Sequence, residues 1–182
     1  MIIEKTPIEG LLIVRPRVFE DGRGYFFESY NRKAFAEAGI AIEFVQDNQS
    51  LSQKGVLRGL HFQEPPYAQA KLVRVITGAV LDVAVDIRRN SPTYGKHVAV
   101  ELNSREKTMF YVPEGFAHGF LTLEDNTVFS YKCSGYYHKA SEGTLLWNDP
   151  DLAIHWNVSD PNLSEKDKLG TPLRIFESPF SL

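Results

Sequence analysis

Three side chains that could take part in proton transfer lie in one apolar stretch, residues 55–78, with the sequence GVLRGLHFQEPPYAQAKLVRVITG. Arg58, His61 and Lys71 are surrounded there by Val, Leu, Ile and Phe. Two cations and an imidazole are costly in an apolar strand pair unless a partner compensates them. An anionic ligand and a proton-transfer reaction would supply that partner, and imidazole titrates near neutral pH. We expect the rest of the chain to form the walls around this stretch.

Composition narrows the class of protein. The chain has 182 residues, 43% of them apolar, and 20 Lys plus Arg against 23 Asp plus Glu give a net charge of -3. These values are ordinary for a globular protein and argue against a nucleic-acid partner. Cys133 is the single cysteine, which excludes an intrachain disulfide and favours a reducing compartment. With no secretory signal or membrane-length apolar run, we expect a cytoplasmic chain without a membrane partner.

Short β-branched and aromatic runs separated by turn residues predict an all-β sandwich or barrel. The expected strands cover residues 11–19, 25–30, 42–51, 57–63, 71–77, 80–87, 96–102, 108–112, 119–123 and 127–133. A helix is expected over residues 31–38, capped by Asn31 and ended by Gly39, and a second, short one over residues 163–169. We expect one domain spanning residues 1–182, with N-terminal strands and a C-terminal segment packed around the barrel.

A metal site is a first hypothesis, since cupin-type β-barrels bind metals through His-x-His and a further His after a Pro-x-Gly turn. Residues 113–118, PEGFAH, contain the second half of this pattern. The first half is broken, because residues 61–63 are His-Phe-Gln and Gln63 stands in place of the second imidazole. The two histidines and Glu64 leave the ligand set one short of a convincing site. We therefore expect a barrel without a metal.

Five sequence blocks follow one another in a specific order. They are Arg58–Gln63, Lys71–Val75, Gly78–Arg88, Pro113–Phe120 and Tyr131–Cys133. Together they resemble the dTDP-4-dehydrorhamnose 3,5-epimerase family of cupin-like sugar nucleotide epimerases. The resemblance implies a mainly β protein, a cupin-type jelly-roll barrel with a few short helices, that forms a homodimer and uses no metal or cofactor. It also implies an isomerase that acts on a dTDP-4-keto-6-deoxyhexose in the formation of dTDP-L-rhamnose or a related deoxysugar.

Inverting a carbon beside a ketone needs a base, an electrophile that stabilises the enolate, and an acid on the opposite face. His61 suits the base, Lys71 the electrophile and Tyr131 the acid. The resemblance implies that Asp167 orients His61 and raises its basicity. Because C3 and C5 both lie next to the C4 ketone, one such set can serve both inversions.

The resemblance also implies a set of residues that bind the nucleotide, the diphosphate or the sugar. They are Arg23, Phe26, Glu28, Gln46, Asn48, Arg58, His118, Tyr137, Glu142 and Lys166. A guanidinium such as that of Arg58 suits a phosphate because it can bond two oxygens at once. Tyr137 could stack on the base or the sugar.

Each candidate also has a structural interpretation. His61 could be a hydrogen-bonded structural histidine, Lys71 could prevent sheet association at an edge, and Tyr131 alternates with core-type residues. The run from Ser164 to Asp167 is also a helix capping box. Two functional alternatives remain: a single-carbon epimerase of a specialised dTDP-deoxysugar pathway, and a non-catalytic jelly roll that binds a nucleotide sugar.

The spacing of Arg58 and His61 sets a geometric condition. Residues three apart point to opposite faces of a regular strand. Both can line one pocket only if the strand is irregular near Gly59, since glycine often marks such irregularities.

Overall fold

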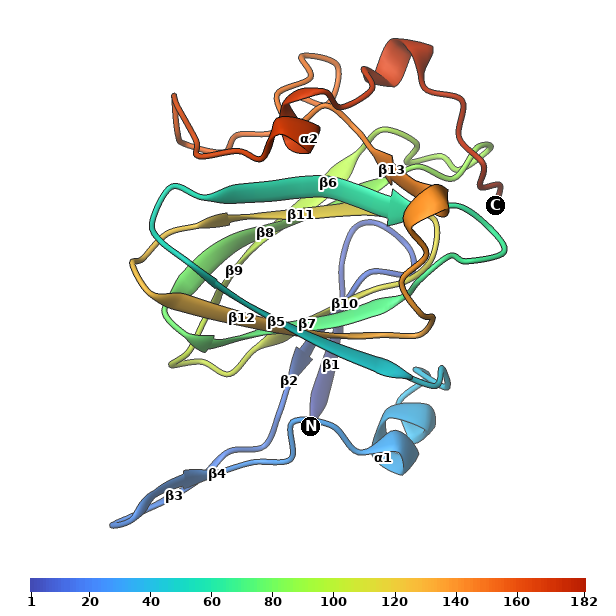
Figure 1. Ribbon diagram of the computed structural model, residues 1–182. Helices are drawn as coiled ribbons and strands as arrows, with labels where there is room; N and C mark the ends of the chain where they lie inside the picture. The colour runs from blue at the N-terminus through green and yellow to red at the C-terminus, as the bar shows by residue number, and fades with distance from the viewer.

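Two antiparallel sheets face each other in the computed structural model, which describes residues 1–182 (Figure 1). The six-stranded sheet contains, in spatial order, β1 (Ile2–Lys5), β2 (Leu12–Arg15), β10 (Met109–Val112), β7 (Lys71–Thr77), β12 (Thr127–Cys133) and β5 (Gln46–Ser52). The five-stranded sheet contains β13 (Glu142–Thr144), β6 (Leu57–Gln63), β11 (Phe116–Thr122), β8 (Ala79–Asp86) and β9 (His97–Asn103). The predicted fold class, a mainly β jelly roll with a few short helices, is confirmed.

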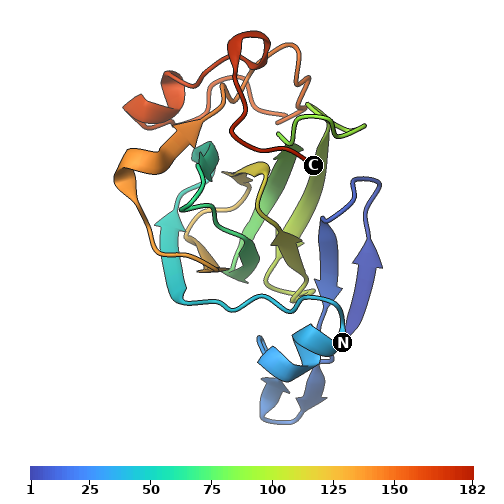
Figure 2. The ribbon, with the colours of Figure 1, turned by 90° about the vertical axis from the view of Figure 1, so that its right-hand side faces the viewer.

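A small hairpin lies outside the two sheets. It is formed by β3 (Phe19–Asp21) and β4 (Gly24–Phe26) and projects from the end of the molecule at which the N-terminus lies (Figures 1 and 2). The helix α1 (Arg32–Glu37) follows it, and Asn31 caps this helix by accepting a hydrogen bond from the Ala34 N–H at 3.2 Å. The predicted start and type of this helix are therefore confirmed.

The remaining short elements lie in the C-terminal part of the chain. They are η1 (Lys139–Ser141), α2 (Glu165–Lys168) and η2 (Leu173–Ile175). The helix α2 lies within the segment predicted to be a short helix. None of the helices is long and apolar enough to cross a membrane.

The predicted strands over residues 57–63, 71–77 and 127–133 are confirmed with the same bounds. The expectation that the first two form one strand pair is wrong, because β6 pairs with β11 and β13 whereas β7 pairs with β10 and β12. The loop between β6 and β7 contains Pro65 and Pro66, which cannot donate to a ladder, and it crosses from one sheet to the other. The apolar stretch therefore contributes one strand to each of the two sheets.

The predicted N-terminal strands are wrong in their bounds. The strand expected over residues 11–19 stops before Pro16, and the one expected over residues 25–30 is only the short β4. Proline cannot donate to a central ladder, which explains the first break. The strand expected over residues 42–51 begins only at Gln46, and β1 and β13 were not predicted.

The strand β8 is buried on both faces. Between the sheets, Val80 and Ala84 pack in a core cluster with Phe110, Phe120 and Phe129. The opposite face packs against the C-terminal segment in a second cluster, which includes Val83, Val85, Ile87, Leu152, Trp156 and Phe180. The C-terminal segment thus covers the outer face of the five-stranded sheet (Figure 1).

The strand β6 is irregular at Gly59, as the spacing of Arg58 and His61 requires. Its register against β11 shifts between His118 and Phe120, and Gly59 has a φ of 137°. A Cβ at Gly59 would lie 2.5 Å from the Cα of Gly119. Two glycine backbones therefore approach closely at the point where the strand turns both side chains into one cavity.

We expect Gly59→Ala to lower the free energy of unfolding by about 2 kcal/mol or more, because the new Cβ collides with backbone and the φ disfavours side chains. Urea denaturation measures the change. Gly22→Ala is the matched control, since a Cβ there meets nothing within 4 Å. Equal losses in the two variants would contradict the close approach as the cause.

Candidate active site

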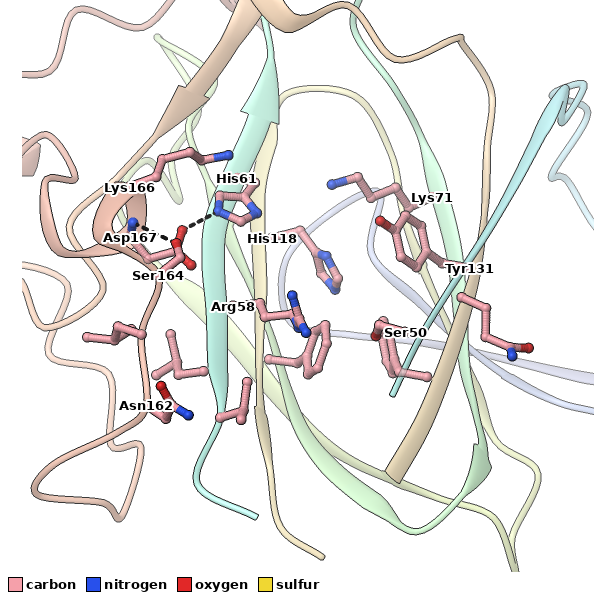
Figure 3. Close-up of a pocket in the computed structure, with 16 residues that line it drawn as sticks. Ser50, Arg58, His61, Lys71, His118, Tyr131, Asn162, Ser164, Lys166 and Asp167 are labelled. Atoms are coloured by element: carbon pink, nitrogen blue, oxygen red, sulfur yellow. Dashed lines mark hydrogen bonds and ion pairs between the residues drawn. The ribbon is translucent and has the colours of Figure 1, made fainter. Parts of the chain in front are cut away.

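A cavity of about 510 Å³ lies between the two sheets, and the C-terminal segment forms one of its sides (Figure 3). Its lining includes Arg58, His61, Lys71, His118, Tyr131, Lys166 and Asp167. A neighbouring hollow of about 390 Å³ is lined by residues that include Gln46, Asn48, Tyr137 and Glu142. The two share His61, Lys71 and Tyr131, so they form one continuous site.

His61 and Asp167 form a close imidazole–carboxylate pair in this site. The Nε2 atom of His61 lies 2.5 Å from Oδ1 of Asp167, and the two side chains are 26% and 3% exposed. Ser164 accepts a hydrogen bond from the Asp167 N–H at 3.2 Å and so caps α2. The Ser164 cap of α2, one half of the predicted capping box, and the contact of Asp167 with His61 are thus present together.

The protonation of this pair follows from its surroundings. Burial lowers the pKa of His61 below its ordinary value, although the hydrogen bond and charge of Asp167 oppose the shift. Burial pushes the pKa of Asp167 upward, but the hydrogen bonds from His61 and Ser164 outweigh it and the pKa is lowered. A carboxylate only accepts hydrogen bonds, so Nε2 of His61 carries the proton and Nδ1 is left as the basic nitrogen.

Lys71 and Tyr131 lie across the cavity from His61 (Figure 3). They come from β7 and β12 of the six-stranded sheet, whereas His61 comes from β6 of the other sheet. Burial lowers the pKa of Lys71, and it raises the pKa of Tyr131, which keeps the phenol protonated. A small group between the walls would therefore meet a base on one face and a proton donor on the other.

The predicted binding residues at this site are held by specific partners. Nε and Nη2 of Arg58 both lie 3.3 Å from Oγ of Ser52, and Nε2 of His118 lies 2.9 Å from Oδ1 of the buried Asp82. Glu142 of the smaller hollow pairs with Lys166 of the larger cavity.

Three of the predicted binding residues do not reach this cavity. Arg23 pairs with Asp21 at 2.5 Å within the β3–β4 hairpin, and the Phe26 side chain there is 67% exposed. Glu28 follows the hairpin and accepts a hydrogen bond from Nδ2 of Asn31 at 3.1 Å. The hairpin projects away from the two sheets (Figures 1 and 2), and none of its residues lines the cavity.

Sequence reasoning missed several lining residues, among them Gln49, Ser50, Phe129 and Asn162. Ser50 has the same parity along β5 as Gln46 and Asn48, and this alternation could have identified it. Its Oγ is buried without a hydrogen-bond partner. Asn162 gives no such signal, because a bridge to Val56 brings it from a distant loop.

The metal hypothesis rested on His61 and His118. In the structure these two side chains bond separate carboxylates, Asp167 and Asp82. No group of three or more His, Cys, Asp and Glu side chains is arranged to hold a metal ion.

This jelly roll presents a carboxylate-bound imidazole on one wall of its cavity, and a buried amine and a phenol on the other. Such a site defines a class of enzyme, the isomerases that transfer protons. The comparisons with known proteins specify the class further. The family model for dTDP-4-dehydrorhamnose 3,5-epimerase matches residues 5–174, and the chain belongs to this family of epimerases.

Individual relatives are similar in sequence to this protein over nearly its whole length. A dTDP-4-dehydrorhamnose 3,5-epimerase of Shigella flexneri is 54% identical over 168 residues, which cover 92% of this chain and 93% of that protein. One of Methanothermobacter thermautotrophicus is 50% identical over 182 residues, which cover 98% and 96%. The crystal structure of a dTDP-6-deoxy-D-glucose-3,5-epimerase from Legionella pneumophila, in complex with dTDP-4-keto-L-rhamnose, has a TM-score of 0.92 and 47% identity, covering 96% of this chain and 94% of that chain.

The pKa of His61 leads to a prediction for pH dependence. If His61 reacts as a neutral base, kcat/KM falls as the pH drops through the pKa of His61, which lies below the ordinary 6.5. Asp167 raises this pKa, so Asp167→Asn should move the acid limb to lower pH. We also expect kcat to fall about 100-fold, because the ring loses its orientation.

Glu165→Gln is the matched control on the same helix, since this carboxylate is 87% exposed and pairs with Lys168. It should leave the acid limb in place. A limb that moves to higher pH in Asp167→Asn would contradict the assigned role of Asp167.

Proposed function

We propose that the protein converts dTDP-4-dehydro-6-deoxy-D-glucose to dTDP-4-dehydro-L-rhamnose by inverting C3 and C5, a step in dTDP-L-rhamnose formation. The observation that carries this proposal is the placement of His61 opposite Tyr131, with Lys71 on the same wall as the phenol. The names of the relatives and the sugar nucleotide bound to the Legionella enzyme support the choice of substrate.

Each inversion uses the two walls in turn. Nδ1 of His61 removes the proton next to the ketone. The electron pair of the broken C–H bond forms the C=C bond of the enolate, and the π pair of the carbonyl moves to its oxygen. The Lys71 amino group donates a hydrogen bond to the enolate oxygen and stabilises its charge. Tyr131 then gives its proton to the carbon from the opposite face, while His61 loses its proton to solvent and solvent reprotonates the phenolate.

The nucleotide part of the substrate would occupy the remainder of the site. In this proposal Arg58 and Lys166 bind the diphosphate and His118 binds the sugar or the phosphate, which their positions in the cavity lining support. Tyr137 stacks on the base beside Gln46 and Asn48, with Glu142 nearby. The substrate already carries the ketone, so the reaction needs no redox cofactor, and a protein base and amine supply the functions that a metal would otherwise provide.

We further propose that the protein acts as a homodimer in which the β3–β4 hairpin of one chain completes the site of the other. Arg23, Phe26 and Glu28 are expected to bind nucleotide, yet they lie on or beside this hairpin and outside the lining of their own cavity. We call the hairpin, residues 19–26, the arm. Phe19 and Tyr25 on this arm are also 51% and 56% exposed. An arm of exposed aromatic and charged side chains suits the surface of a second copy.

We infer a cytoplasmic location without a nucleic-acid or membrane partner. Cys133 is a free, buried thiol, which fits a reducing compartment. A net charge of -3 does not favour association with nucleic acid or anionic lipid.

Incubation with dTDP-4-keto-6-deoxyglucose in D₂O, followed by NMR, tests the reaction. We expect deuterium at both C3 and C5, with loss of exchange at both in His61→Ala and no effect of EDTA. Incorporation at one carbon would instead identify a single-carbon epimerase. Tight dTDP binding without any exchange would identify a non-catalytic binding protein.

Mixed dimers test the arm. Arg23→Ala and His61→Ala homodimers should each be impaired, because every site lacks one group. After the two variants are mixed and allowed to exchange subunits, a heterodimer contains one site with both groups intact, so activity should recover. No recovery, despite subunit exchange shown by native mass spectrometry, would mean that the arm serves its own chain.

A further inference from the structure

Gln63 stands where a cupin-type metal site would place its second imidazole, and the proposed reaction gives it no role. It lies at the end of β6, is only 5% exposed and lines the smaller of the two hollows, the one that Gln46 and Tyr137 also line. Nε2 donates to the carbonyl oxygens of Tyr67 at 2.7 Å and Tyr136 at 3.2 Å, and Oε1 accepts from the His138 N–H at 2.8 Å. All three bonds therefore go to the backbone of two loops.

The chemistry of an amide matches these three backbone groups. Its NH₂ group has two donors for the two carbonyls, and its oxygen accepts from the N–H. A neutral imidazole has one donor and one acceptor, whereas a carboxylate has acceptors only. Glutamine is thus the side chain that can satisfy the groups that meet at this position.

These bonds lie on both sides of Tyr137. Gln63 binds one group in each of the two peptides that flank this residue, and the Tyr137 N–H donates to Oε1 of Gln46 at 3.0 Å. Residues 136–138 belong to no helix or strand. Side-chain amides therefore fix the backbone of Tyr137 in the place of secondary structure.

The ring of Tyr137 is not fixed by the core. Its side chain is 55% exposed and borders the cavity, and its hydroxyl donates to Oε2 of Glu142 at 3.3 Å. Further contacts support the same loop, since Nε2 of Gln69 donates to the Gly135 carbonyl at 2.6 Å. The position of the ring thus depends on how its backbone is held.

We propose that Gln63 is a positioning residue that holds the Tyr137 ring at the cavity, where the ring stacks on a planar group of the ligand. The identity of that planar group as a nucleobase rests on the proposed function. Gln63 then acts on ligand affinity through Tyr137 and leaves proton transfer at His61 unaffected.

Two substitutions remove these bonds in different ways. Gln63→Met keeps a similar volume without polar atoms, and Gln63→Glu places an acceptor against two carbonyls. In both variants we expect the Kd for dTDP, measured by calorimetry, to rise about tenfold, which corresponds to about 1.4 kcal/mol. The Kd for inorganic pyrophosphate and kcat at saturating substrate should stay nearly constant. In the free protein, the His138 amide should exchange hydrogen faster.

Gln53→Met is the matched control. Gln53 is an exposed glutamine that forms hydrogen bonds with a distant turn. Its Nε2 donates to Oδ1 of Asn126 at 3.1 Å, and its Oε1 accepts from the Asn126 N–H at 3.2 Å. It should change neither Kd nor the exchange of His138. Thermal unfolding of all variants shows whether each remains folded.

A double-mutant cycle separates positioning from a general structural effect. In a Tyr137→Ala background, Gln63→Met should weaken dTDP binding no further, because the ring that it positions is absent. Additive losses, an equal loss of pyrophosphate affinity, or unchanged exchange of the His138 amide would each overturn the proposal. If the wild-type protein fails to bind dTDP, the proposed function fails, whereas hydrogen exchange in the free protein still decides the role of Gln63.

Discussion

The hydrogen bond between His61 and Asp167 joins segments 106 residues apart, and the rest of the site depends on it. It can form only because the C-terminal segment packs on the outer face of the five-stranded sheet, where Leu152 and Trp156 are buried. Apolar burial is the dominant favourable term in folding. The same burial that stabilises the jelly roll therefore also holds the Asp167 carboxylate next to His61. Stability and chemistry are therefore coupled through one packing interface.

Burial also determines what the other polar groups of the cavity can do. It favours the neutral form of the His61 imidazole and the protonated form of the Tyr131 phenol, since the pKa of the first is lowered and that of the second is raised. The same environment strengthens the attraction between Lys71 and a developing negative charge. Because the two walls belong to different sheets, the imidazole and the phenol face each other across the cavity.

Much of this arrangement could be predicted from the sequence, and the exceptions have physical causes. The strands that border the cavity follow from alternation and turn residues, and the irregularity at Gly59 follows from the spacing of Arg58 and His61. Sheet membership did not follow, because β6 and β7 look like a hairpin in sequence but belong to opposite walls. Alternation along a strand gives its faces and contains no information on which strand lies beside it.

The positions of Asp167 and of the hairpin residues mark a second limit of prediction from the sequence. Asp167 matched the family pattern, but only the packing of the C-terminal segment explains how a residue in the first turn of α2 also meets His61. Arg23, Phe26 and Glu28 are close in sequence to the first strands, and nothing in that sequence indicates that the hairpin leaves its own cavity. The direction of the hairpin is a property of the tertiary structure.

The strand order has a consequence for how the chain acquires this structure during synthesis. The strands β1 and β2 pair locally, but the free edge of β2 is paired only when Met109 joins Val14. About half of the chain must therefore leave the ribosome with this edge open, and Asp167 emerges later still. Non-local pairing of this kind slows folding, and the contact between His61 and Asp167 is among the last to become possible as a new chain is made.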